Sequence, residues 1–235
     1  MDSADIELAG FLFLPTSQDK TPIQIFIVLG ATGIFAGLLT YFLTPEQFVA
    51  ASVGERVYAA CASRETTIAE ELGLQGESVY IPREEGEATQ LFVPLDADYS
   101  LPDEHRGPLV LESETRGLLV ETTGGALFKD FEQTVSGELS TRPNNLAVQL
   151  CDGLVDGFEL ATRAEPDIDT ENHRITVAIT ESAYGAVDRF DHPISSFLAV
   201  GFAIGLDQPV RLTINRGGER SDWLVTCEYN IDTKN

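Results

Sequence analysis

The sequence predicts an α+β protein in which helices pack on an antiparallel sheet, preceded by one N-terminal transmembrane helix. Residues 22–43 form an uncharged apolar run, which is long enough to span a bilayer. Between residues 78 and 231, short strand-like segments alternate with turns and with stretches of helical periodicity. We therefore expect a short acidic tail at 1–21, a membrane helix at 22–43 and an acidic α+β domain at 45–235.

The apolar run reads PIQIFIVLGATGIFAGLLTYFL and predicts a single-pass anchor in the lipid bilayer of the cell membrane. The acidic residues before it argue against a cleaved signal peptide. Gly33 and Gly37 form a GxxxG motif, which lets a second helix pack closely. That helix could belong to another copy of the chain or to a partner in a membrane complex. Arg56 and Arg64 follow the run, which favours a cytoplasmic position for the domain.

The first half of the domain predicts one helix and four strands. Apolar residues at helical spacing indicate a helix from residue 45 to Gly73, a glycine that suits a left-handed C-cap. Two apolar runs at 78–82 and 89–95 flank a charged turn and predict a β-hairpin. Short strands at 108–111 and 117–121 should follow it.

The second half alternates helices and strands. Gly124–Gly125 predicts a hinge before a helix at 126–139. Pro143 suits the first turn of a helix that would extend to about residue 160. The remaining expected elements are a strand at 174–179, a short buried helix at 194–206, a strand at 209–215, a turn at Gly217–Gly218 and a last strand at 223–231.

Charge is the unusual feature of the composition. The chain has 38 acidic and 15 basic residues, which gives a net charge of −23. Nucleic-acid binding needs clusters of Lys and Arg, so no nucleic-acid partner is expected. The basic residues are 12 Arg and only 3 Lys, and this bias resembles proteins of extreme halophiles. Concentrated salt screens the repulsion, so the acidic clusters are expected to be solvated surface.

The cysteines and histidines predict no metal site. Cys61, Cys151 and Cys227 are odd in number and far apart, which is typical of free, buried thiols in a reducing compartment. The three histidines form no HxxxH or HExxH pattern, so a zinc site has no support. No cofactor and no catalytic residue is predicted.

The densest polar cluster beside apolar core is Asp188, Arg189, Asp191 and His192. An Asp can orient a His for acid–base work. It can equally cap the following helix and bind Arg189 locally, and the sequence leaves both interpretations open.

The candidate ligand-binding residues are His192, Phe197, Gly201 and Tyr184. Aromatic residues are more often part of a core than of a binding site, so a core role is the alternative for Tyr184 and Phe197.

The order of segments in residues 143–231 resembles the small-molecule-binding domain of the 4-vinyl-reductase type. A helix and the strand ITVAI precede DHPISSFLAVGFAIGLDQPVRLTINR, and WLVTCEYNI ends the unit. The matching positions are Pro193, Phe197, Gly201, Gly205, Val210 and Cys227–Glu228–Tyr229. The resemblance implies an α+β ligand-binding domain, from a superfamily that includes vesicle-tethering transport-particle subunits and haem-based nitric-oxide sensors.

The chain departs from that family at its cysteines. Ser195 or Ser196 occupies the family's first Cys position, and the strand-loop segment has no Cys. A metal or redox role therefore does not carry over from the family. The whole chain also resembles a group of membrane-anchored proteins of halophilic archaea.

Together these patterns predict a membrane-anchored, non-catalytic module of an extreme halophile that binds a small ligand or a protein partner at the membrane. The alternative is a structural accessory subunit of a membrane protein complex. An enzyme whose site is assembled only in space is a third possibility. A ligand module needs an apolar pocket, a subunit needs an exposed apolar patch, and an enzyme needs converging titratable groups.

Overall fold

The computed structural model describes residues 20–43, 51–83, 88–102, 107–135 and 137–231. The chain divides into two compact units, residues 1–48 and 49–235. In the first unit, helix α1 extends over Lys20–Leu43. Residues 1–19 of the predicted acidic tail lie outside the described part of the chain. The side chains at both ends of the predicted membrane span also lie outside it.

Within the described part of the chain, no helix combines the length and the apolar character that crossing a membrane requires.

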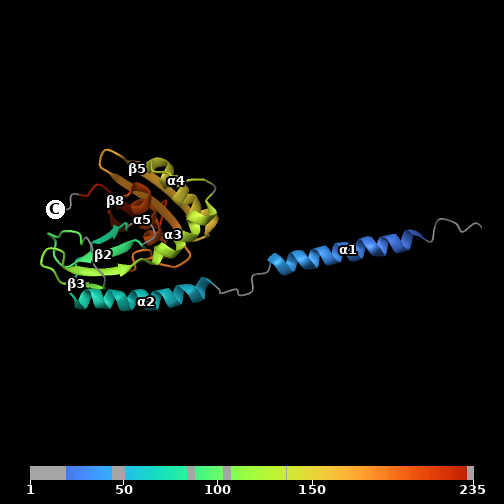
Figure 1. The fold of residues 1–235 in the computed structure, drawn as a ribbon, viewed down its shortest axis with the longest axis horizontal. Coiled ribbons are helices and arrows are strands. Elements are labelled where there is room, and N and C mark those ends of the chain that lie inside the picture. The colour runs from blue at the N-terminus through green and yellow to red at the C-terminus, as the bar shows by residue number, and fades with distance from the viewer. Residues whose placement is uncertain (1–19, 44–50, 84–87, 103–106, 136, 232–235) are drawn as a thin grey trace, which may run out of the picture. The chain divides into compact units, whose positions relative to one another are not determined.

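The second unit is built on one eight-stranded sheet, in which every neighbouring pair is antiparallel. The strand order is β3-β4-β2-β1-β7-β8-β6-β5 (Figure 1). The strands are β1 (Ser78–Ile81), β2 (Gln90–Pro94), β3 (Leu109–Val110), β4 (Gly117–Glu121), β5 (Ala161–Asp169), β6 (Arg174–Ser182), β7 (Val210–Arg216) and β8 (Trp223–Glu228). The predicted α+β class and antiparallel sheet are confirmed.

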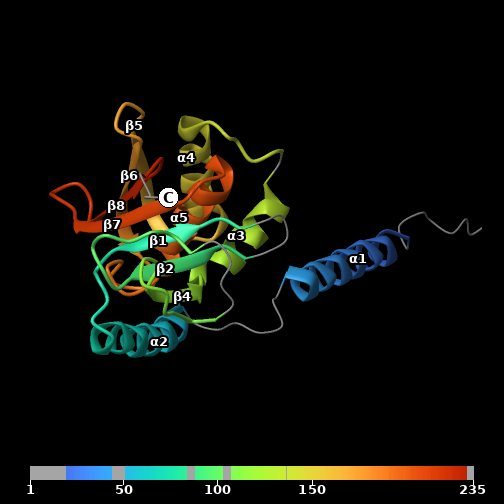
Figure 2. The ribbon, with the colours of Figure 1, turned by 60° about the vertical axis from the view of Figure 1, so that its left-hand side comes forward.

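A layer of helices covers one face of this sheet. Helix α5 (Pro193–Leu206) lies over β1, β7 and β8, and α3 (Thr123–Thr134) packs beside it (Figure 2). Helix α4 (Pro143–Asp152) packs on β5, β6 and α5. Helix α2 (Ala51–Glu71) lies outside this layer, at the periphery of the unit.

Successive side chains of each strand point to opposite faces of the sheet, so the buried apolar residues form two separate clusters. Tyr80, Leu91 and Val225 point to the helix-covered face and belong to the large core. On the opposite face, Val79 and Phe92 belong to a smaller cluster that includes loop residues. This period-two pattern is the reason that the strands of the sheet were readable from sequence.

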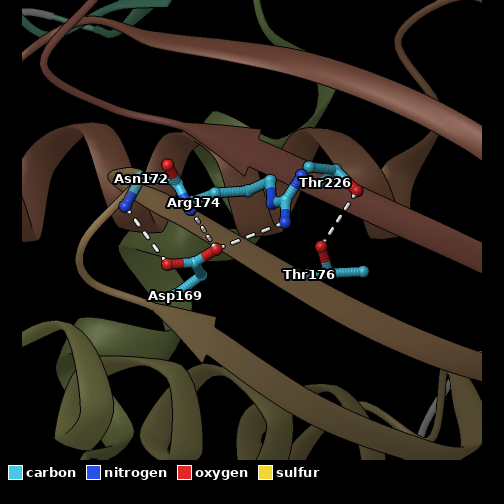
Figure 3. A network of polar contacts seen from close by, with 5 residues as sticks. All are labelled: Asp169, Asn172, Arg174, Thr176 and Thr226. Carbon is cyan, nitrogen blue, oxygen red and sulfur yellow. Dashed lines mark hydrogen bonds and ion pairs between the residues drawn. The ribbon is translucent and has the colours of Figure 1, made fainter.

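The strand β5, absent from the sequence expectations, forms a long hairpin with β6 (Figure 3). In its turn, Asp169 accepts hydrogen bonds from the backbone N–H of Asn172 and from its side-chain amide, at 3.1 and 2.7 Å. Arg174 also donates to Asp169, at 3.3 Å. On the next strand pair, the hydroxyls of Thr176 and Thr226 hydrogen-bond at 3.1 Å. Asp169 therefore holds the turn of this hairpin.

The predicted hinge at Gly124–Gly125 is wrong, because both glycines lie inside α3. A Cβ on Gly124 would lie 2.3 Å from the backbone nitrogen of Phe197. The glycine therefore permits close contact between the backbones of α3 and α5, which no larger residue would allow.

The helix predicted for 143–160 is shorter than expected. It changes at Gly153 into a π-helical turn, η1 (Gly153–Gly157). The predicted helix at 45–73 is observed as α2, and residues 44–50 lie outside the described part.

A candidate ligand-binding cleft

A cleft of about 430 Å³ opens on the helix side of the sheet, next to α5. One wall is α2, which contributes Thr66, Ala69 and Glu70. The other walls are β1, β7 and the segment 188–191 that leads into α5. Because a small-molecule site typically measures several hundred Å³, the cleft has a suitable size for one small ligand.

The floor of the cleft combines buried apolar and buried polar groups. Val93 and Leu212 supply apolar surface, while Tyr80 and Ser195 are wholly buried polar residues. Asp191 lies beside them with only 8% of its surface exposed. A buried carboxylate is costly unless hydrogen bonds stabilise it, so its partners are informative.

Both oxygens of Asp191 accept hydrogen bonds. The Tyr80 hydroxyl donates to Oδ1 at 2.8 Å, and the backbone N–H of Thr123 donates to Oδ2. Thr123 is the first residue of α3, so the carboxylate lies at the positive end of that helix. The next N–H, of Gly124, donates to Ser196 Oγ at 2.8 Å. The start of α3 is thus capped by two residues from the beginning of α5.

Asp191 has a left-handed backbone, with φ at 44°. Asp tolerates this region better than most residues. The conformation turns its carboxylate toward Tyr80 and α3. The sequence suggested that an Asp might cap α5, but His192 is the N-cap of that helix.

His192 is fully buried, and its Nδ1 accepts the backbone N–H of Ile194 at 3.2 Å. The proton of the neutral ring therefore belongs on Nε2. Nε2 has no hydrogen-bond partner among the described residues. The Tyr184 backbone lies near enough to favour protonation of the His192 ring, yet it does not form a hydrogen bond with Nε2.

Burial dominates the electrostatics of this group. It lowers the pKa of His192 to about 4, against the smaller, opposite influence of the Tyr184 backbone, while the positive Arg189 lowers it further. Burial and the negative Asp191 hold the pKa of Tyr80 well above its usual value. At neutral pH, His192 is uncharged and Tyr80 is a phenol.

The N-terminal half of α2 is attached to the same segment. The Tyr58 hydroxyl donates to the carbonyl of Phe190 at 2.9 Å, and its ring meets His192 edge-on at 5.3 Å. Glu55 pairs with Arg189 at 3.6 Å. Arg189 also donates to the backbone carbonyl of Tyr184 at 3.2 Å, so α2 and the local backbone hold it, rather than a neighbouring Asp.

A second arginine borders the cleft from β7. Arg211 lies 3.5 Å from Glu77 and 3.7 Å from Glu228. Both arginines of the cleft are thus paired with carboxylates. Since these pairs are partly exposed, each contributes little to stability.

The chain was compared with known proteins. A family model described as "Domain of unknown function (DUF7982)" matches residues 6–229, nearly the whole chain. The chain belongs to this family. No curated protein and no solved structure matches it.

In this DUF7982 chain, the four candidate ligand residues fall into two groups. Tyr184 and His192 both lie against Tyr58 of α2, and neither lines the cleft. Phe197 instead packs among Phe128, Phe131 and Phe158. A Cβ on Gly201 would lie 2.5 Å from Leu150, so this glycine holds α5 against α4. The lining of the cleft therefore includes none of the four candidate ligand residues.

Sequence reasoning missed Tyr80, Ser195 and the wall formed by α2. Tyr80 and Asp191 are 111 residues apart, and no local pattern joins them. The one available signal was a tyrosine inside an otherwise apolar strand, because a buried tyrosine hydroxyl usually needs a partner.

Ser195 and the two buried cysteines of the domain are engaged in or enclosed by the core. Ser195 donates to the backbone carbonyl of His192 at 3.2 Å rather than to its ring, so the two form no nucleophile–base pair. Burial raises the pKa of Cys151 to about 12 and that of Cys227 further, which keeps both as unreactive thiols. Among the described residues, no group of His, Cys, Asp or Glu could hold a metal ion.

Proposed function

We propose that the chain is a membrane-anchored, non-catalytic module of a halophilic cell that binds a small ligand in the cleft between α2 and the sheet. The observation that supports this most directly is the cleft itself, with Asp191 and Tyr80 hydrogen-bonded at its buried floor. Fixed polar groups beside apolar surface orient small ligands in protein sites, and this cleft has both, with polar residues the more numerous in its lining.

Two further features agree with the proposal. The resemblance of residues 143–231 to a small-molecule-binding domain agrees with a ligand role. The uncharged run at 22–43, with its GxxxG motif, is of the length that anchors a protein in a bilayer. The cytoplasmic position of the domain remains part of this proposal and rests on Arg56 and Arg64 alone.

A cleft-filling variant tests the ligand role. Ala69→Trp places a large ring in the cleft from the α2 wall, whereas Ser63→Trp places one on an exposed position of the same helix. We expect native mass spectrometry of the wild-type chain, extracted from its own membranes, to show an added small-molecule mass. Ala69→Trp should lose that mass and Ser63→Trp should keep it.

Other outcomes of that measurement would redirect the proposal. Co-extracted protein chains without a small molecule would favour an accessory subunit of a membrane complex. If the Ala69→Trp variant keeps the added mass, the ligand binds outside this cleft. Recovery of the domain in the soluble fraction after cell lysis would contradict the anchor.

A further inference from the structure

The outward face of α2 carries the longest row of exposed apolar side chains in the second unit, as far as the structure describes it. Val53, Val57, Ile68 and Leu72 expose 48%, 62%, 46% and 40% of their surfaces. They recur at helical spacing, with exposed Arg64 between them. We call these four residues the α2 stripe. On a chain of net charge −23, such a stripe is unusual surface.

The stripe contributes nothing to the fold described above. The opposite side of α2 faces the domain through Gly54, Tyr58 and the wholly buried Ala62. Scattered exposed apolar residues are normal, but four along one side of one helix indicate a surface that binds something.

We propose that the α2 stripe binds the same stripe of a second copy of this chain, with the two helices antiparallel. In that arrangement Val57 of each copy faces Ile68 of the other. Val53 and Leu72 then meet at the two ends of the contact. A self-complementary patch is what a two-fold dimer requires.

The charges beside the stripe select this orientation. Arg56 and Glu71 are exposed at opposite ends of α2. An antiparallel pair therefore brings Arg56 of one copy near Glu71 of the other, twice per dimer. A parallel pair would instead place Arg56 against Arg56 and Glu71 against Glu71, where like charges repel, whereas Arg64, near the middle of the helix, meets its own copy in either orientation.

The same charges disfavour a membrane surface as the occupant. Glu70 and Glu71 are exposed at the C-terminal end of the helix, and the chain as a whole is strongly acidic. Helices that bind anionic lipid instead carry Lys and Arg on the polar face.

One helix pair is a small interface. With a rise of 1.5 Å per residue, α2 is about 32 Å long, so the contact lies at the low end of specific interfaces. Two acidic chains also repel each other until salt screens them. Dimerisation should therefore strengthen from millimolar to molar KCl. This inference does not depend on the cleft or on its ligand.

Site-directed cross-linking tests both contact and orientation. The full chain, with Cys61→Ser to remove the half-buried thiol of α2, carries either Val57→Cys or Ile68→Cys. In detergent and molar KCl, a short bismaleimide should join a mixture of the two variants several-fold more efficiently than either variant alone. In an antiparallel pair, two copies of residue 57 would lie about 16 Å apart along the helix axes, beyond its reach. A mixture that reacts no better than the single variants overturns the proposal.

Charge exchange provides a second, independent test. At salt below molar, where surface charge pairs are less screened, Arg56→Glu and Glu71→Arg should each lower the dimer fraction measured by light scattering a few-fold, and the double variant should recover it. Val57→Glu with Ile68→Glu should give a monomer, whereas Val148→Glu, on an equally exposed valine of α4, should leave the dimer intact. Circular dichroism checks that each variant is folded. A wild-type chain that remains monomeric, or a dimer unaffected by Val57→Glu with Ile68→Glu, would refute the α2 contact.

Discussion

Helices α5 and α2 border the same cleft and are held in opposite ways. In α5, twelve of fourteen residues are buried, and Gly201 and Gly205 allow Leu150 and Leu146 to approach its backbone. In α2, Ala62 alone is buried among the residues whose side chains are described, and the helix is linked to the domain by an ion pair, a tyrosine hydroxyl and ring contacts. The α5 wall of the cleft is therefore part of the core, whereas the α2 wall is a separate element held by a few polar contacts.

The largest effect is expected from a single methyl group on the α5 side. Gly124→Ala places a Cβ 2.3 Å from the backbone of Phe197, and backbone cannot move aside as a side chain can. We expect a loss of about 3 kcal/mol or more in the free energy of unfolding. Chemical denaturation in molar KCl measures it.

The matched control is Gly157→Ala, where a new Cβ would meet no atom within 4 Å. Its free energy of unfolding should change by less than about 0.5 kcal/mol. Equal losses for the two variants would show that α3 and α5 do not pack as closely as described.

An intermediate effect is expected where the two helices meet, at His192. Its folded pKa is about 4, and the unfolded chain protonates near pH 6.5. Above pH 6.5 neither state binds the proton, so stability is unaffected. Between pH 6.5 and 4 only the unfolded state gains it, so stability falls, by about 2 kcal/mol at pH 5.

Replacement by asparagine isolates this contribution. His192→Asn keeps a side chain able to cap α5 but removes the titration, so its unfolding free energy should change little between pH 6.5 and 5. His173→Asn, at an exposed turn position that asparagine also tolerates, should retain the wild-type slope. A wild-type profile that is flat over this range would contradict the burial of His192.

The smallest effect is expected on the α2 side. Tyr58→Phe removes the hydroxyl that donates to Phe190 but keeps the ring against His192. We expect a loss of about 1 kcal/mol in the free energy of unfolding, since one hydrogen bond is removed. Hydrogen exchange should accelerate in α2 and stay unchanged in α5; faster exchange in both helices would show that they unfold as one unit.

The same contrast explains which elements could be predicted from sequence. Helix α5 is apolar and buried almost all round, and strands such as β6 alternate buried and less buried residues, so both could be predicted from sequence. Strand β5 was missed because its residues ATRAEPDID are mostly polar. It lies at the edge of the sheet and is held by its pairing with β6.

The candidate site was only partly predictable. The cluster around His192 was found because its polar residues are adjacent in the chain. Its principal contacts were not, because Tyr80 and Tyr58 reach it from distant segments. The glycines of α3 were misread because a Gly pair in a sequence favours a hinge. Close packing of one helix on another depends on the tertiary structure and leaves no local sequence pattern.

The join between β1 and β7 has a consequence for how the domain folds and opens. Strands β1–β4 form one block from consecutive chain and β5–β8 another; within the sheet three residue pairs of β1 with β7 join them, and α5 lies across the join. Each block can form from local contacts, whereas the join must close a long loop and should form late. Because both strands border the cleft, a ligand bound there would act as a clasp across the two blocks and slow their separation.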